Sequence, residues 1–180
     1  PEVRAWTITK GTKAELKEIV GTLRREIPDI VLRTTLITGF PGETPENHEE
    51  LMEFIDEMEF DRLGVFTYSA EEDTPAASMP EQVDEEVKKD RQAELMELQQ
   101  DISLDKGNEK IGRDMLVMIE GKVADENAYV GRTYGDAPNV DGYIFVNTDM
   151  ELMSGDLCQV HVTGALEYDL IGELKDEYTE

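Results

Sequence analysis

The stretch Leu32-Arg-Thr-Thr-Leu-Ile-Thr-Gly-Phe-Pro-Gly-Glu-Thr44 decides the fold. Its first part is rich in β-branched residues and predicts a strand over about residues 30–38. The Gly-Phe-Pro-Gly segment is typical of a loop. Thr44 and Pro45 are the residue types that helices prefer at the N-cap and the first helical position. A strand, a short loop and a helix in this order indicate one unit of a parallel sheet.

The sequence on either side extends this pattern. Thr12 and Glu15 have the spacing of a capping box, which predicts a helix that ends before Pro28. A second strand is expected over residues 62–69, and a long helix over residues 84–106 with a narrow apolar seam and solvated charged faces. Two strands do not form a stable sheet by themselves. We therefore expect either a piece of a larger barrel or pairing with another chain.

The first strand has two different faces. Side chains alternate along a strand, so Arg33, Thr35 and Ile37 share one side. Two polar residues on that side are consistent with a polar cavity. They are equally consistent with a buried or edge arginine that pairs with a carboxylate.

The pattern changes after Ile111, where short strands alternate with turns and indicate a small five-stranded barrel. Apolar and polar residues alternate along the strand that contains Cys158, and Cys158 lies on the apolar side. This position predicts a core thiol rather than a nucleophile. The five predicted strands cover residues 115–120, 128–133, 143–147, 157–163 and 168–174.

The composition limits the function classes. The chain has 180 residues, with 42 acidic against 17 basic residues and a net charge of −25. No apolar run is long enough to span a membrane and no signal peptide is visible, so we expect a cytoplasmic protein. A single cysteine excludes a cluster or zinc site built from this chain's own thiolates. The last 70 residues hold only four Lys and Arg, which disfavours RNA and favours a basic protein partner or simply a solvated acidic surface.

Three strings together carry a family resemblance. They are Leu32-Arg-Thr-Thr-Leu-Ile-Thr-Gly-Phe-Pro-Gly-Glu-Thr44, Phe66-Thr-Tyr-Ser69 followed by Thr74-Pro-Ala-Ala77, and Val130-Gly-Arg-Thr-Tyr-Gly-Asp-Ala-Pro-Asn-Val-Asp-Gly142. With these strings, the chain from residue 11 onward resembles the C-terminal half of the radical-SAM methylthiotransferases, most closely the RimO group, which modifies an aspartate of ribosomal protein S twelve.

The resemblance implies a layout of α/β plus all-β type. Residues 1–83 would be the C-terminal part of a radical-SAM partial TIM-like barrel, residues 84–110 a connecting helix, and residues 111–180 an OB-like TRAM barrel. It implies S-adenosyl-L-methionine (SAM) and two four-iron–four-sulfur clusters as cofactors of the full-length enzyme. The family's cluster cysteines are missing here. The chain alone is therefore predicted to be inactive, with no catalytic or metal-binding residue of its own.

The resemblance also suggests cofactor-binding residues on the first strand, in its loop and on the second strand. Ile37 matches the apolar position against which the adenine of SAM packs. The sequence departs from the family pattern GxIxGxxE, because Thr35 replaces the first glycine and Glu43 is shifted by one position. The full candidate set is Arg33, Thr35, Ile37, Gly39, Gly42 and Tyr68.

Three functions follow as hypotheses. The first is a fragment of an enzyme for ribosomal protein S twelve, whose acidic TRAM domain docks that basic protein. The second is a fragment of a MiaB-like tRNA methylthiotransferase, for which Arg113, Lys122, Arg132 and Lys175 are few basic residues. The third is a non-enzymatic binding module that contains a TRAM-like domain.

Overall fold

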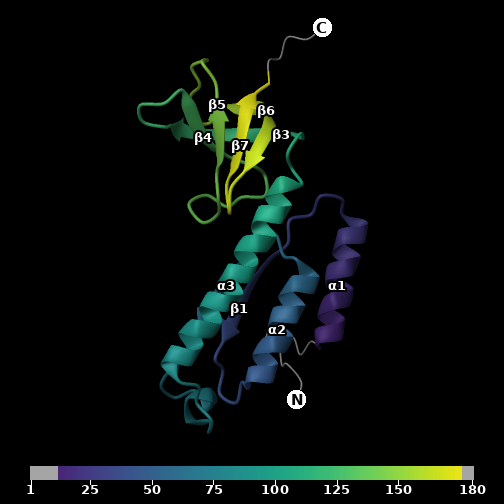
Figure 1. Ribbon diagram of the computed structural model, residues 1–180, viewed down its shortest axis with the longest axis vertical. Helices are drawn as coiled ribbons and strands as arrows, with labels where there is room; N and C mark the ends of the chain where they lie inside the picture. Colours follow the sequence, from purple (N-terminus) through teal and green to yellow (C-terminus); the bar gives the residue numbers. More distant parts are fainter. Residues whose placement is uncertain (1–11, 176–180) are drawn as a thin grey trace. The chain divides into compact units, whose positions relative to one another are not determined.

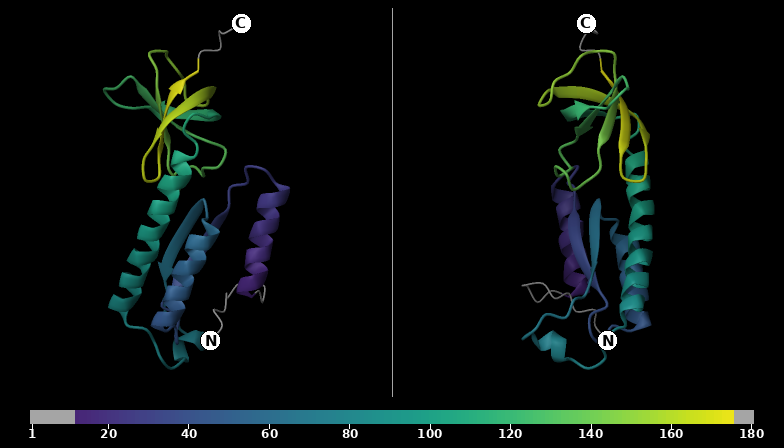
Figure 2. Two further views of the ribbon diagram at one scale, coloured as in Figure 1. Left: turned by 45° about the vertical axis from the view of Figure 1, so that its right-hand side comes forward. Right: turned by 90° about the vertical axis from the view of Figure 1, so that its left-hand side faces the viewer.

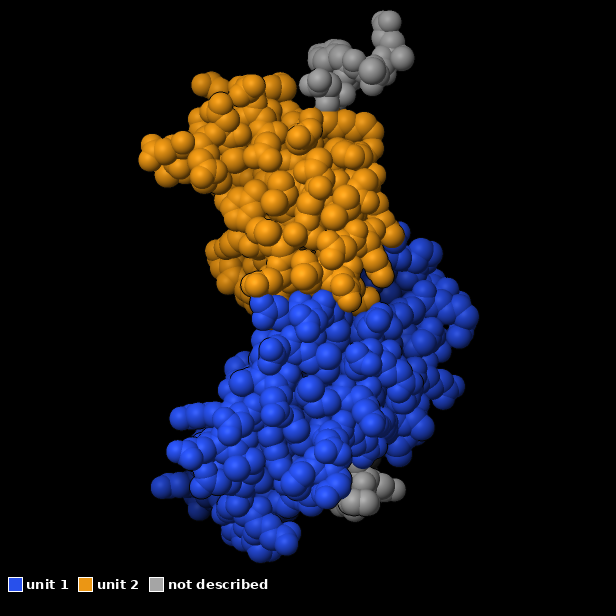
Figure 3. Space-filling view, viewed as in Figure 1, with its two compact units in different colours: residues 1–102 blue, residues 103–180 orange. Residues whose placement is uncertain are grey.

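The computed structural model describes residues 12–175, and the chain forms two compact units, residues 1–102 and 103–180 (Figure 3). The start of the predicted segment 1–83 and the end of the predicted segment 111–180 lie outside the described residues. The elements, labelled in Figure 1, are α1 (Lys13–Glu26), β1 (Arg33–Thr38), α2 (Pro45–Met58), β2 (Arg62–Thr67), the 3₁₀ helix η1 (Pro75–Ser78), α3 (Glu85–Asn108), β3 (Asp114–Lys122), β4 (Ala128–Arg132), β5 (Ile144–Asn147), β6 (Leu157–Ala165) and β7 (Leu170–Leu174).

The helix starts agree with the predicted caps. The Thr12 hydroxyl accepts a hydrogen bond from the Glu15 backbone N–H at 3.3 Å, and the Glu15 carboxylate accepts one from the Thr12 N–H at 2.7 Å. Thr44 caps α2 in the same way with Asn47, and Pro45 stands at the first helical position. Each pair satisfies backbone N–H groups that have no partner within the helix.

The predicted parallel sheet is confirmed. β1 and β2 pair in parallel with Arg33 opposite Arg62 and Ile37 opposite Phe66. The backbone N–H groups of even-numbered β2 residues face β1, as the 2.8 Å bond from Tyr68 to the Thr38 carbonyl shows. Odd-numbered residues therefore face the other edge of β2.

All three long helices of this unit pack on one face of the strand pair, and Figures 1 and 2 show them running beside the strands. The hydrophobic core contains Val20 of α1, Ile55 of α2 and Leu95 of α3, together with Leu63 and Val65 of β2. No helix in residues 12–102 covers the opposite face. There Ile37 is 59% exposed and Phe66 is 62% exposed.

The second unit is the predicted five-stranded barrel. Its strands close in the order β3-β4-β5-β7-β6, and only the β5–β7 pair is parallel. Val117, Ile144 and Val160 are fully buried at its centre. Cys158 is partly buried against the same core. None of the described helices is both long and apolar enough to cross a membrane.

Candidate cofactor-binding face and its loops

The predicted strand face forms an open surface. Arg33 and Thr35 are exposed, and the partner of Thr35 on β2 is Gly64, which has no side chain to cover it. The carboxyl ends of both strands meet at one end of this face, which is where ligands bind in open α/β sheets. Arg33 lies at the other end of β1. It is separated from Gly39 by six residues, or about 20 Å of strand.

Two glycines shape the loop that follows β1. Gly39 has a φ of +77° and Gly42 a φ of +84°, a backbone region that favours glycine. A Cβ on Gly39 would lie 2.3 Å from Cγ of Lys88, so Gly39 is needed where the loop meets α3. Around Gly42 the nearest other atom, a carboxylate oxygen of Glu81, would be 3.6 Å from such a Cβ. Gly42 therefore has more open space than Gly39.

Glu43 ties this loop together. Its carboxylate accepts hydrogen bonds from the Gly39 backbone N–H at 2.8 Å and from the Thr38 hydroxyl at 3.1 Å. Arg91 of α3 contacts the same carboxylate at 2.6 Å and also donates to the Glu43 carbonyl at 3.2 Å. The two side chains are only 9% and 13% exposed. Hydrogen bonds between ionised groups in such a dry setting are stronger than neutral ones.

Tyr68 lies directly after β2, at the same end of the sheet as the loop. The Lys88 ammonium group donates to the Tyr68 carbonyl at 3.1 Å and to Glu85 at 2.6 Å, and it stands 5.4 Å from the centre of the Tyr68 ring. The Phe40 ring meets the Tyr68 ring edge-on at 5.1 Å. The Tyr68 hydroxyl is buried and has no hydrogen-bond partner in the described structure. A buried polar atom of this kind is uncommon and can mark a ligand contact.

The structure thus brings four of the six predicted residues to one end of the open face, and the other two lie further along β1. Ile37, Gly39, Gly42 and Tyr68 surround the carboxyl ends of the strands. The sequence reasoning missed Lys88 and Arg91, because it placed the charged side chains of the long helix in solvent.

The expected exposure to solvent is wrong for Lys88 and Arg91, which are 3% and 8% exposed. They occur at helical spacing with the buried Leu95 and Ile102, so they lie on the side of α3 that faces the core. Val87, near the start of α3, is exposed. Spacing relative to Leu95 is the signal that would have found the two charged residues.

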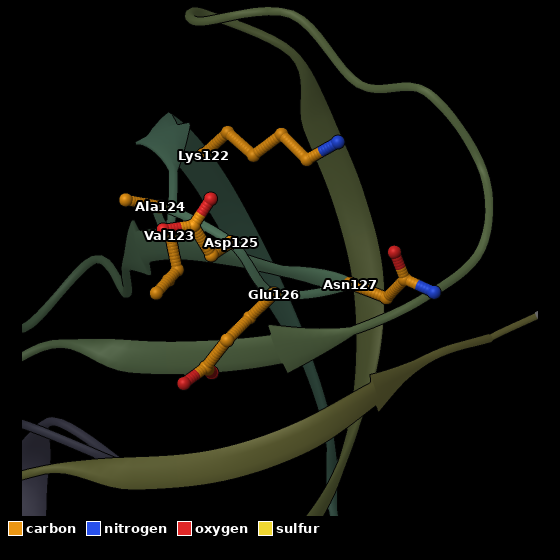
Figure 4. A pocket seen from close by; sticks show the side chains of 6 residues that line it. All are labelled: Lys122, Val123, Ala124, Asp125, Glu126 and Asn127. Carbon is orange, nitrogen blue, oxygen red and sulfur yellow. The ribbon is translucent and has the colours of Figure 1, made fainter.

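Other groups that could carry chemistry have structural partners. His48 is buried on α2 and its Nε2 lies 2.7 Å from the Glu94 carboxylate. Residues 12–175 hold no group of three His, Cys, Asp or Glu side chains placed to bind a metal ion. A hollow at the β3–β4 turn is lined by residues 122–127 (Figure 4), and Glu126 points away from Lys122 there. The hollow belongs to the barrel unit.

The basic residues of the barrel lie beside partners of the same unit. Arg132 contacts Glu120 at 2.8 Å, and Lys122 stands over the Tyr129 ring. Lys175 donates to Asp114, and this hydrogen bond, followed by that with His161, lowers the pKa of the Asp114 carboxyl.

Comparisons with known proteins agree with this architecture. Residues 111–174 match the TRAM domain family. The chain is 60% identical over 158 residues to the ribosomal protein uS12 methylthiotransferase RimO of Lachnoclostridium phytofermentans, covering 88% of this chain and 36% of that protein. It is 50% identical to the protein of that name from Pelotomaculum thermopropionicum over 91% of this chain and 37% of the relative. It is 48% identical to the protein of that name from Clostridium botulinum strain Hall, over 95% of this chain and 38% of the relative.

The matched region covers almost all of this chain but little more than a third of each relative. The resemblance drawn from the three sequence strings is therefore confirmed, as is the barrel predicted after residue 111. Over most of its length the chain is thus similar to the C-terminal part of proteins named as RimO methylthiotransferases, and residues 111–174 form a TRAM domain.

Proposed function

We propose that this chain is part of a radical-SAM enzyme that transfers a methylthio group to an aspartate of ribosomal protein uS12 in the cytoplasm. The observation that carries the proposal is the 60% identity, over 88% of the chain, to a relative named for that activity. In this proposal, the exposed sheet face of residues 12–102 binds SAM and the acidic barrel binds the substrate protein.

The iron–sulfur clusters do not fit this chain. Each four-iron–four-sulfur cluster needs several cysteine thiolates. The sequence has one cysteine, Cys158, and it packs against the barrel core. Both clusters would therefore be held by the rest of the enzyme, and we expect the chain alone to be inactive.

SAM fits the open face better. Bound SAM supplies a carbon radical once its sulfonium is reductively cleaved. Ile37 and Phe66 offer exposed apolar surface to its adenine, and the Tyr68 hydroxyl offers a buried donor without a partner among the described residues. The open space at Gly42 allows a ligand to approach the backbone. Thr35 and Arg33, further along β1, could contact the SAM carboxylate or the substrate.

The TRAM barrel would bind the substrate protein. Residues 111–180 contain 15 acidic and four basic residues, a net charge of −11. Ribosomal proteins are strongly basic, so opposite charges would steer and orient the encounter. The same charge repels phosphates, and we expect no binding of RNA.

The test uses the complete gene product with its clusters reconstituted, SAM, a sulfur donor and a reductant. Mass spectrometry should detect a methylthio group on uS12, and uS12 with its target aspartate replaced by alanine should remain unmodified. Modification of tRNA instead of uS12 would establish the MiaB-like alternative. A complete gene that lacks cluster cysteines would establish the non-enzymatic binding module.

A binding assay addresses the barrel separately. The 180-residue chain should bind uS12 at low ionic strength and lose affinity as salt rises, because exposed charges are screened beyond about 10 Å at 0.1 M salt. Binding to tRNA at physiological salt, with none to uS12 even at low salt, would refute this role of the barrel.

A further inference from the structure

We infer that Lys88 and Arg91 of α3 are positioning residues, which hold the loops after β1 and β2 in the conformation that binds a ligand. The inference rests on the proposed function in taking SAM as that ligand. α3 lies outside the predicted site, and neither side chain belongs to the set identified from the sequence. Both come from the first two turns of α3, on one side of the helix.

Arg91 acts on the loop after β1. Another contact fixes this loop to a distant part of the chain, because the Gly42 backbone N–H donates to the Glu81 carbonyl at 2.9 Å. Arg91 holds both the carboxylate and the carbonyl of Glu43. The carboxylate in turn holds the Gly39 backbone N–H. Through these contacts, α3 fixes the position of Gly39, the first residue of the loop.

Lys88 acts on the loop after β2 and on Gly39 together. Its ammonium group holds the Tyr68 carbonyl, while its aliphatic carbons fill the space beside Gly39. Tyr68 carries the orphan hydroxyl, and its ring is fixed between Phe40 and the Lys88 ammonium. Through Lys88 and Arg91, a single helix face sets the distance between the two loops that border the candidate site.

Charge removal at Arg91 tests the inference in the complete enzyme. Arg91→Met leaves the Glu43 carboxylate buried and unpaired, which also destabilises the fold. The double variant Glu43→Gln/Arg91→Met removes both charges, which restores stability because no uncompensated charge remains. The matched control is Lys13→Met/Glu50→Gln, which removes an ion pair of 3.0 Å between α1 and α2 away from the loops.

Two readouts are needed: the dissociation constant of S-adenosylhomocysteine, measured by calorimetry, and the hydrogen exchange of residues 39–43. We expect the double variant to regain the thermal midpoint lost in Arg91→Met. Its ligand should still bind about tenfold more weakly, and its loop should exchange at least tenfold faster. The control should match the unsubstituted enzyme in both.

The outcomes separate the two claims. Unchanged ligand affinity and unchanged loop exchange in the double variant would overturn the positioning role. Faster exchange with unchanged affinity would overturn the link between the loops and the ligand. If the unsubstituted enzyme bound neither S-adenosylhomocysteine nor SAM, the proposed function would fail, and with it the ligand part of this inference. Loop exchange would still decide whether Arg91 holds the loop.

Discussion

Replacing Gly39 by alanine should loosen the strand ends far more than the same change at Gly42. Both glycines have positive φ values, so each alanine carries the left-handed backbone penalty of about 1–2 kcal/mol. Only at Gly39 does the new Cβ meet another residue, at 2.3 Å from Lys88 Cγ and 3.0 Å from its Cδ. Lys88 must then move, although it is buried and bonded to the Tyr68 carbonyl.

The extra cost follows from that movement. Losing a hydrogen bond from a charged donor costs about 1.5–3 kcal/mol. Gly39→Ala should therefore destabilise this unit by about 2.5–5 kcal/mol, against about 1–2 kcal/mol for Gly42→Ala. Hydrogen exchange of the β1 and β2 amides in the complete enzyme measures this local free energy, and the barrel amides serve as an internal control.

Lys88→Ala provides a sharper check, because it removes the Cγ and Cδ atoms that a Cβ added at Gly39 would meet. In a double-mutant cycle, Gly39→Ala should cost about 2 kcal/mol less when position 88 is already alanine. If the two changes were simply additive, close packing between Gly39 and Lys88 could not be the reason for a glycine at this position.

Three further outcomes are expected. Gly131→Ala should lower the thermal midpoint of the barrel and cost about 1–3 kcal/mol through overpacking, because its Cβ would lie 2.5 Å from a Val117 methyl. The control variant Gly164→Ala should change the midpoint little, because its Cβ would lie 3.6 Å from the nearest neighbouring atom. Lys175 and His161 lower the pKa of the Asp114 carboxyl in the folded barrel. The ionised carboxylate therefore stabilises the barrel above its unfolded pKa of about 3.9, and this stabilisation is lost as pH falls through the lower folded pKa. Asp114→Asn should flatten the decline of the barrel's thermal midpoint at acidic pH. In the 180-residue chain, amides of residues 12–69 should exchange faster than those of residues 111–175, and equal protection would contradict the view that the two-stranded sheet needs further strands.

The sequence predicted local structure well where short-range chemistry controls it. The capping box at Thr12, the N-cap at Thr44 and the alternation around Cys158 each depend on residues only a few positions apart. The five strands of the barrel followed from the same short-range signals.

The contacts that shape the candidate site were beyond that reasoning. The partner of Glu43 is Arg91, 48 residues later, and nothing near either residue in the sequence indicates the pair. An arginine in an acidic, charge-rich helix is solvated in most proteins. Gly39 was predicted to bind a cofactor, and its close neighbour in the structure is the Lys88 side chain. Ligand contact at the candidate residues stays a prediction.

The two edges of the sheet indicate where further strands can pair. At β2, the Gln92 side chain of α3 donates a 2.6 Å hydrogen bond to the Val65 carbonyl, one of the backbone groups that face away from β1. A further strand could not pair there without displacing α3. Among residues 12–175 no strand pairs with the other edge of β1, so additional strands can only be added on that side. All three helices already occupy one face, and the exposed side chains of Ile37 and Phe66 would then line the inside of the enlarged sheet. Under the proposed function, this exposed face would then form one wall of the site that binds SAM.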